Sequence, residues 1–216
     1  MITAHNIRKN YEGLEVLKGV SVDINEGEIV SIVGSSGAGK STLLHILGTL
    51  AKADSGSLKI NRKVIDKLNA KQLASFRNEE IGFIFQAHQL LPEFSALENV
   101  CIPAWIKGDS KKEAKKKATE LLTSLGLKDR IHHKPMELSG GEQQRVAVAR
   151  ALINNPSVVF ADEPSGNLDS ESAKILHELF FKLRDQYNQT FVIVTHNRKL
   201  AQMSDRMLEM KDGLIV

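Results

Sequence analysis

The sequence predicts an α/β fold built on a parallel sheet, with an antiparallel β segment at the N-terminus and an inserted helical segment. Short apolar, β-branched runs alternate with helical patterns, which is the arrangement of an α/β layer fold. The residues before about Glu28 instead show short strands with turn signals at "YEG" and "NEG". From about Gln86 to Pro135 the strand signals stop, which predicts a helical insert within the α/β core.

Several apolar runs are expected to form the strands of the parallel sheet. They are continuous rather than alternating in polarity, as is typical of strands that are covered on both faces. The runs are "EIVSIVG" (28–34), "IGFIFQ" (81–86), "SVVFADE" (157–163) and "TFVIVTH" (190–196).

Helical patterns occupy the intervals between these runs. Within the insert, residues 97–106 and 111–127 are expected to be helices, the second ending at Gly126. The helices expected in the core are "STLLHILGTL" (41–50), "QQRVAVARALI" (143–153) and "SAKILHELFFKLRDQ" (172–186).

We therefore expect a single domain over residues 1–216. The α/β core with its antiparallel piece would occupy approximately residues 1–86 and 141–216, and the helical subdomain approximately residues 87–140. No internal repeat or low-complexity linker divides the chain.

The composition restricts the possible partners. Hydrophobic residues make up 42% and charged residues 25%, and a net charge of only +3 gives no strong case for nucleic acid. The single cysteine, Cys101, cannot form an internal disulfide, which fits a reducing cytosol. The N-terminus lacks the apolar core of a signal peptide, and no apolar run reaches the roughly 20 residues needed to cross a bilayer. Any contact with a membrane is therefore expected to run through a partner.

The stretch "GSSGAGKS", residues 34–41, predicts a phosphate site. It follows an apolar strand and opens a helix, which is the context of a G-x-x-x-x-G-K-[ST] phosphate loop. Glycines allow backbone N–H groups to turn inward around an anion, and the helix N-terminus adds its positive dipole end. Lys40 can then reach the β- and γ-phosphates of a nucleotide, and the hydroxyl of Ser41 can bind Mg²⁺.

Two carboxylates follow the apolar strand "VVFADE", residues 158–163. Their position predicts that they lie at the carboxyl edge of the sheet, where ligands bind in open α/β folds. Asp162 suits Mg²⁺ coordination, with a water molecule between the carboxylate and the ion. Glu163 is then available to orient or deprotonate an attacking water molecule.

A second candidate anion site lies in "LSGGEQQR", residues 138–145. Ser139 and Glu142 form an S-x-x-E capping box in front of an apolar helix. The two glycines leave first-turn amides uncovered, although a helix-interior glycine costs about 1 kcal/mol relative to alanine. The nucleotide phosphates could therefore be held from two sides, either within one chain or between two chains.

These motifs, in this order and spacing, resemble the nucleotide-binding domain of ABC (ATP-binding cassette) proteins over the whole chain. The Walker A loop, the Walker B strand and the family signature correspond to the three stretches just described. Gln86 stands at the position of the Q-loop, "NLDS" (167–170) resembles the D-loop, and His196 resembles the switch histidine. The resemblance implies a RecA-like P-loop core with an antiparallel β subdomain and a helical subdomain.

The resemblance also implies a head-to-tail dimer around two ATP molecules, each held between the phosphate loop of one chain and the signature of the other. Glu163 and His196 are the implied catalytic residues, and Ser41, Gln86 and Asp162 the implied Mg²⁺ ligands. Whether Glu163 accepts a proton or only positions water stays open. By resemblance, Tyr11 stacks on adenine and Asp169 communicates across the dimer. The implied ATP-binding residues are Tyr11, Gly34, Ser35, Ser36, Gly37, Ala38, Gly39, Lys40, Ser41, Thr42, Gln86, Ser139, Gly140, Gly141 and Asp169.

Two stretches narrow the resemblance. "EPSGNLD" (163–169) resembles a subfamily that contains lipoprotein-releasing, macrolide-efflux and cell-division ATPases, and "LLPEFSALENV" (90–100) most resembles the lipoprotein-releasing ATPases. The interval between phosphate loop and signature has no sustained heptads, unlike that of chromosome-organising cassettes. A single cassette also differs from the tandem pair of translation-factor cassettes.

The resemblance implies that residues 88–100 dock on integral membrane subunits, although core packing is an equally good interpretation of Leu90, Leu91 or Phe94 taken singly. The implied function is ATP hydrolysis that drives release of outer-membrane lipoproteins, at the cytoplasmic face of the bacterial inner membrane. The alternative is a cell-division or efflux ATPase with a related partner. His5, His45 and His177 are expected to belong to no site.

Overall fold

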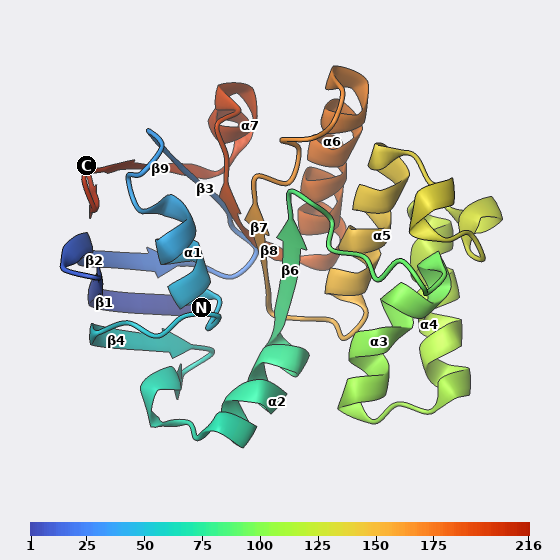
Figure 1. Ribbon diagram of the computed structural model, residues 1–216, viewed down its shortest axis with the longest axis horizontal. Coiled ribbons are helices and arrows are strands. Elements are labelled where there is room, and N and C mark those ends of the chain that lie inside the picture. Colours follow the sequence, from blue (N-terminus) through green and yellow to red (C-terminus); the bar gives the residue numbers. More distant parts are fainter.

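The computed structural model describes residues 1–216 and is organised around a six-stranded sheet (Figure 1). The strand order is β10-β9-β3-β8-β7-β6, and only the β10–β9 pair is antiparallel. The expected parallel strands are therefore confirmed as members of one sheet. Its strands are β3 (Ile29–Gly34), β6 (Ile81–Phe85), β7 (Val158–Asp162), β8 (Thr190–Val194), β9 (Arg206–Lys211) and β10 (Leu214–Ile215).

Both faces of this sheet are buried, which explains the continuous apolar runs. Val158 and Phe160 of β7 face a core cluster of 24 buried residues. Val159 and Ala161, which alternate with them, face a second cluster of 27 buried residues on the other side. Because successive side chains of a strand point to opposite faces, a strand between two cores must be apolar at every position.

A second, four-stranded antiparallel sheet covers one of these cores, with the order β2-β1-β4-β5. The expected antiparallel segment at the N-terminus is confirmed, but it contributes only half of the sheet. The other half follows the first helix in the chain, where no strand was predicted. The strands are β1 (Ile2–Tyr11), β2 (Leu14–Ile24), β4 (Ser55–Ile60) and β5 (Lys63–Val64).

The five predicted helices are present and differ from the predictions mainly at their ends, whereas α2 and α7 were not predicted. The first stops at Leu47 rather than at residue 50, because Gly48 follows and Thr49 has a left-handed φ of 63°. The signature helix begins at Gly140, three residues before the predicted start. The helices are α1 (Lys40–Leu47), α2 (Ala70–Glu80), α3 (Ala96–Lys107), α4 (Lys111–Ser124), α5 (Gly140–Leu152), α6 (Ser170–Tyr187) and α7 (Arg198–Met203).

The helical insert is formed by α3 and α4, which lie beside α5 at the right of Figure 1. Each insert helix begins with a capping box, at Ser95 and Ser110, and α4 ends before Gly126, which is left-handed at φ 73°. Buried residues of the insert belong to the same core cluster as the neighbouring face of the sheet. The insert thus shares a core with the sheet. None of the helices is both long and apolar enough to span a membrane.

Candidate functional site

The phosphate loop runs from the end of β3 into α1, and its glycines are needed for different structural reasons. Gly34, Gly37 and Gly39 have φ angles of 150°, 80° and 97°. A Cβ on Gly34 would lie 2.2 Å from the carbonyl oxygen of Met210, and one on Gly39 would lie 2.9 Å from Leu17. Gly37 has nothing within 4 Å of such a position. Two glycines are therefore required by packing, while Gly37 lies at the open side of the loop.

The N-terminus of α1 has no side-chain cap. Its N-cap residue is Gly39, and no acidic residue lies in its first turn. The amino group of Lys40 folds back over the loop and donates to the carbonyl oxygens of Gly34 and Ser35 at 3.0 and 2.9 Å. A buried cation and uncapped helix amides therefore face the same loop, which is the arrangement expected for phosphate.

Ser41 and Asp162, far apart in the sequence, come together beside this loop. The hydroxyl of Ser41 donates to Oδ1 of Asp162 at 3.1 Å. His45, which was expected to belong to no site, lies with Nε2 3.7 Å from Oδ2 of Asp162. The sequence could have indicated this contact, because His45 lies four residues after Ser41 and residues four apart on a helix share a face. Hydroxyl and carboxylate oxygens fit Mg²⁺, which takes few protein ligands when phosphates supply the others.

Glu163 follows β7 in a strained backbone conformation, with a φ of 46°. Its N–H donates to the carbonyl of Val194 at 2.9 Å, and its Oε2 accepts from the N–H of His196 at 3.1 Å. Burial raises the pKa of its carboxyl group, against the lowering effects of the His196 amide, the His196 ring and Lys40, while Asp162 adds to the increase. A carboxylate with a raised pKa beside a phosphate loop is suited to proton transfer.

The ring of His196 lies close to the same carboxylate. Its Nε2 is 3.0 Å from Oε1 of Glu163. No hydrogen bond is formed between these two atoms, so Oε1 is a buried acceptor without a donor. Such groups are rare in folded proteins and concentrate at functional sites.

Gln86 is tied to the loop that follows β7. Its Nε2 donates to Oδ1 of Asn167 at 2.8 Å, and Nδ2 of Asn167 donates back to the carbonyl of Gln86 at 3.2 Å. Asp169 is the N-cap of α6 and accepts from the amides of Glu171 and Ser172 at 3.0 and 2.9 Å. These amide hydrogen bonds and that of the Ser172 side chain lower the pKa of Asp169. This aspartate therefore also stabilises a helix, a use that the sequence analysis did not consider.

The signature forms the N-terminus of α5, as the sequence predicts. Ser139 and Glu142 make a complete capping box, and Nε of Arg130 donates to Glu142 at 3.0 Å. Gly140 is exposed, and a Cβ there would approach only Leu168, at 3.7 Å. Gly141 is buried, and a Cβ there would lie 2.8 Å from Oγ of Ser172. The second glycine therefore has a packing reason of its own, and only the first is open to an approaching molecule.

A single chain does not bring its two candidate anion sites together. In Figure 1 the phosphate loop leads into α1 at the left, whereas α5 lies at the right, with β7 and β8 between them. Tyr11, the predicted adenine-stacking residue, is 47% exposed at the end of β1, with Lys9 Nζ 5.2 Å from the centre of its ring. The two candidate anion sites therefore lie apart within one chain.

The β6–α3 loop, residues 86–95, holds apolar side chains at the surface. Asn99 of α3 is fully buried, accepts from the amide of Leu91 at 2.8 Å and donates to three carbonyl oxygens around the loop. Leu91 and Phe94 are 44% and 37% exposed, whereas Leu90 packs against the core. Core packing is therefore the interpretation that fits Leu90, whereas Leu91 and Phe94 are exposed enough to contact a partner.

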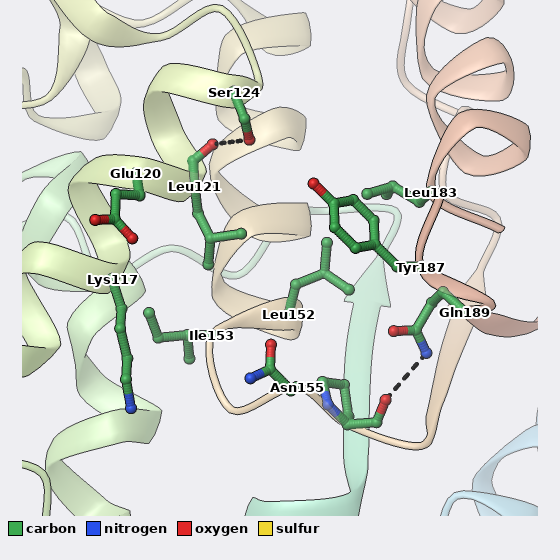
Figure 2. A pocket seen from close by; sticks show the side chains of 11 residues that line it. Lys117, Glu120, Leu121, Ser124, Leu152, Ile153, Asn155, Leu183, Tyr187 and Gln189 are labelled. Atoms are coloured by element: carbon green, nitrogen blue, oxygen red, sulfur yellow. Dashed lines mark hydrogen bonds between the residues drawn. The ribbon is translucent and has the colours of Figure 1, made fainter. Parts of the chain in front are cut away.

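Beside this loop lies a hollow between α2, α3 and the end of α5. Phe83 and Pro103 line it, together with Ile106, whose side chain is 70% exposed. A separate pocket lies between α4 and the ends of α5 and α6, and Figure 2 shows its floor of Leu121, Leu152 and other aliphatic side chains. None of the predicted site residues lines this second pocket.

Comparison with known proteins identifies relatives along the whole chain. A family model described as ABC transporter matches residues 17–166. The lipoprotein-releasing system ATP-binding protein LolD of Bacteroides thetaiotaomicron is 59% identical over 215 residues, covering 100% of this chain and 99% of the relative. LolD of Porphyromonas gingivalis is 60% identical over 215 residues, covering 100% and 98%.

Two solved structures with the same fold are described as dimeric cassettes. One is a post-hydrolysis state of an ATP-binding cassette bound to ADP and Pi, with a TM-score of 0.91, 40% identity, and coverage of 100% of this chain and 96% of that chain. Another is described as a bacterial ABC transporter cassette, with a TM-score of 0.91, 42% identity and the same coverage. The expected fold and the expected family are both confirmed.

Proposed function

Because the chain belongs to the ABC transporter family, we propose that it is the ATP-hydrolysing subunit of a lipoprotein-releasing system. The observation that carries this proposal is the 59% identity to a LolD protein, which covers 100% of this chain and 99% of the relative. The β6–α3 loop supports it, since it exposes apolar side chains beside a hollow.

ATP binding is assigned to the phosphate loop and to Tyr11. The loop amides and Lys40 bind the β- and γ-phosphates, and the ring of Tyr11 stacks on adenine. Mg²⁺, for which Ser41, Asp162 and Gln86 offer oxygen ligands, supplies neutralisation of the phosphate charge when it is bound.

Hydrolysis is assigned to Glu163 and His196. Glu163 orients a water molecule and accepts its proton while the water oxygen attacks the γ-phosphorus, and the bond to the oxygen that bridges to ADP breaks. The raised pKa of Glu163 supports this, because a base of higher pKa accepts a proton more readily. His196 contacts the γ-phosphate side, and its backbone N–H holds Glu163 through Oε2 at 3.1 Å.

The second half of each ATP site comes from another copy of the chain. Ser139, Gly140 and Gly141 of one chain meet the γ-phosphate bound by the phosphate loop of the other. The separation of the two halves within one chain supports this head-to-tail arrangement, as do the dimeric relatives. Asp169 communicates across the same interface.

The membrane partner docks on residues 88–100 and the adjacent hollow. Closure of the dimer around ATP would bring the two docking surfaces of the dimer closer and move the membrane subunits. In this arrangement the chain lies at the cytoplasmic face of the inner membrane and contacts the membrane through its partners. The cargo would be lipoproteins destined for the outer membrane.

Docking can be tested with Leu91→Asp and Phe94→Asp. An apolar anchor at an interface is worth about 1–3 kcal/mol, and each variant also buries an unpaired charge, so membrane subunits should co-purify at least about tenfold less. Leu214→Asp is the matched control, because Leu214 is 42% exposed and lies on β10. Folding and ATP binding are measured in parallel.

The outcomes separate the proposal from its alternative. If both charged variants fold and still co-purify at wild-type levels, the docking assignment is wrong. If docking fails and outer-membrane lipoproteins accumulate in the inner membrane, lipoprotein release is supported. If lipoproteins sort normally while cell division or efflux is disturbed, the cell-division or efflux function replaces it.

A further inference from the structure

The β6–α3 loop contains two consecutive residues in an unfavourable backbone conformation. His88 and Gln89 have φ angles of 56° and 50°. Neither is glycine, so this left-handed conformation persists only where the surrounding structure imposes it. Strained residues of this kind cluster in switch regions and ligand clamps, which makes the groups that hold them worth identifying.

Arg150 of α5 holds the backbone of both residues. Its guanidinium donates to the carbonyl of Gln89 at 2.6 Å and to that of His88 at 2.8 Å. No carboxylate pairs with it, and burial lowers its pKa. A partly buried arginine whose hydrogen bonds go to two backbone carbonyls of a single loop restrains that loop in two directions.

Gln144 also lies on α5, six residues before Arg150. It holds the side chain of His88. Gln144 is fully buried, and its Nε2 donates to the carbonyl of Pro164 at 2.6 Å. Its Oε1 contacts Nδ1 of His88. An amide oxygen can only accept, so the proton of this hydrogen bond belongs to Nδ1 of His88. Since Pro164 follows Glu163, one amide joins the catalytic segment to the β6–α3 loop.

We propose that Gln144 and Arg150 are positioning residues that tie the β6–α3 loop to α5. This inference rests on the proposed function, in which the N-terminus of α5 meets the ATP bound by the other chain. Gln86 ties the same loop to Asn167 at 2.8 Å, on the side of the chain's own ATP. The loop therefore responds to both ATP molecules of the dimer, to one through Gln86 and to the other through α5.

The test is hydrogen–deuterium exchange of the full chain carrying Glu163→Gln, with and without Mg-ATP. Addition of ATP should slow exchange in the β6–α3 loop. Gln144→Leu should raise exchange of the loop about tenfold without nucleotide, the effect of one buried hydrogen-bond network, and should reduce its response to ATP to the part that Gln86 transmits. Protection of α1 by ATP should stay at the level of the parent, which shows that the nucleotide still binds.

Gln189→Leu is the matched control. Gln189 is also buried, and its Nε2 also donates to backbone carbonyls, those of Pro156 and Thr190 at 3.1 and 3.3 Å. It lies outside the loop and α5, so this variant should leave loop exchange unchanged. Equal loosening of the loop in both glutamine variants would mean a general loss of stability and would overturn the inference.

His88 supplies a second test that does not depend on a buried substitution. His88→Asn retains a donor near the position of Nδ1 and tolerates the left-handed backbone, so it should preserve the response of the loop to ATP. His88→Leu should reduce that response to the part that Gln86 transmits. A loop whose exchange in both Gln144→Leu and His88→Leu stays within about twofold of the parent would overturn the proposed link.

These measurements use the isolated chain, so the identity of the membrane partner does not enter. A parent chain whose β6–α3 loop shows no response to ATP would overturn the inference and leave the lipoprotein-releasing function untouched. Conversely, a loop that responds as described in a chain whose partner proves to be a cell-division protein would retain the link and change only the function that it serves.

Discussion

The N-termini of α1 and α5 are both candidate anion sites, yet they are built in opposite ways. At α1, the N-cap is Gly39, no side chain occupies the first-turn amides, and Lys40 lies over the loop. At α5, Ser139 and Glu142 form a capping box that already uses two amides. Glu142 is negative, with a pKa lowered chiefly by the backbone N–H of Ser139. A negative charge in the first turn weakens attraction for an anion.

The difference indicates that the two helix ends have different roles. The α1 end has a cation and uncapped amides, so it can bind phosphate by itself. The α5 end is capped by its own side chains, and neither capping residue is a cation. Its Gly140 is exposed. We therefore expect damage at α1 to weaken nucleotide binding, and damage at α5 to affect assembly and turnover.

The largest expected effect is on hydrolysis and leaves both helix ends intact. Glu163→Gln should reduce ATP hydrolysis by about 10²–10⁴, the range for loss of a general base. ATP binding should be retained, and the stalled chain should accumulate as a dimer. Turnover assays together with light scattering, with and without ATP, provide the measurement. A variant that stays monomeric with ATP, alone and with its membrane partner, would argue against the contribution of α5 in trans.

The next effect concerns the α1 end. Lys40→Ala removes the side-chain cation of the phosphate loop, and a charged hydrogen bond is worth about 1.5–3 kcal/mol, so affinity for Mg-ATP should fall roughly 10- to 150-fold. Titration with a fluorescent ATP analogue measures this. The same titration of Gly140→Ala serves as the control, since the α5 end should not contribute to binding by the isolated chain. Unchanged affinity in Lys40→Ala would show that the phosphate loop is misassigned.

A smaller effect separates the two glycines of the signature. Gly140→Ala should stabilise the fold by up to about 1 kcal/mol through helix propensity, while hydrolysis falls by roughly tenfold because a methyl group intrudes on the partner's ATP. Gly141→Ala should destabilise the fold by about 1–3 kcal/mol, the usual cost of overpacking, because the new Cβ meets Ser172. Thermal unfolding and turnover of both variants check this. If the two glycines behave alike, the distinction between an open and a packed position fails.

The smallest effect is the dependence of stability on pH at Glu163. Burial raises the pKa of this carboxyl group, so its ionised form costs stability in the folded state at neutral pH. Glu163→Gln should therefore be more stable than the wild type at neutral pH. The difference should shrink as the pH falls through the raised pKa and vanish below the ordinary pKa of glutamate. Unfolding in urea across this range is the measurement, and a difference that grows toward low pH would contradict the burial argument.

The predicted strands were recovered because burial on two faces leaves a signal at every position, as in Val158–Asp162. The strand Ser55–Ile60 was not predicted, because its buried residues alternate with exposed ones and it lies at a distance in sequence from its partner β1. His45 was assigned to no site, since its approach to Asp162 depends on how α1 packs beside β7. The packing reason for Gly141 depends in the same way on α6.

The amino-acid sequence alone predicts the local chemistry of this protein: a phosphate loop between a strand and a helix, two acids at a strand end, and a capping box that encloses two glycines. Local motifs suffice for these because their geometry is set by residues close together in the chain. Which residues from distant parts of the chain meet depends on the tertiary structure. It placed Ser41 at 3.1 Å from Asp162, separated the α1 and α5 ends within one chain, and joined His88 to the catalytic segment through Gln144. Those contacts depend on the packing of helices against both faces of the sheet, which no local pattern encodes.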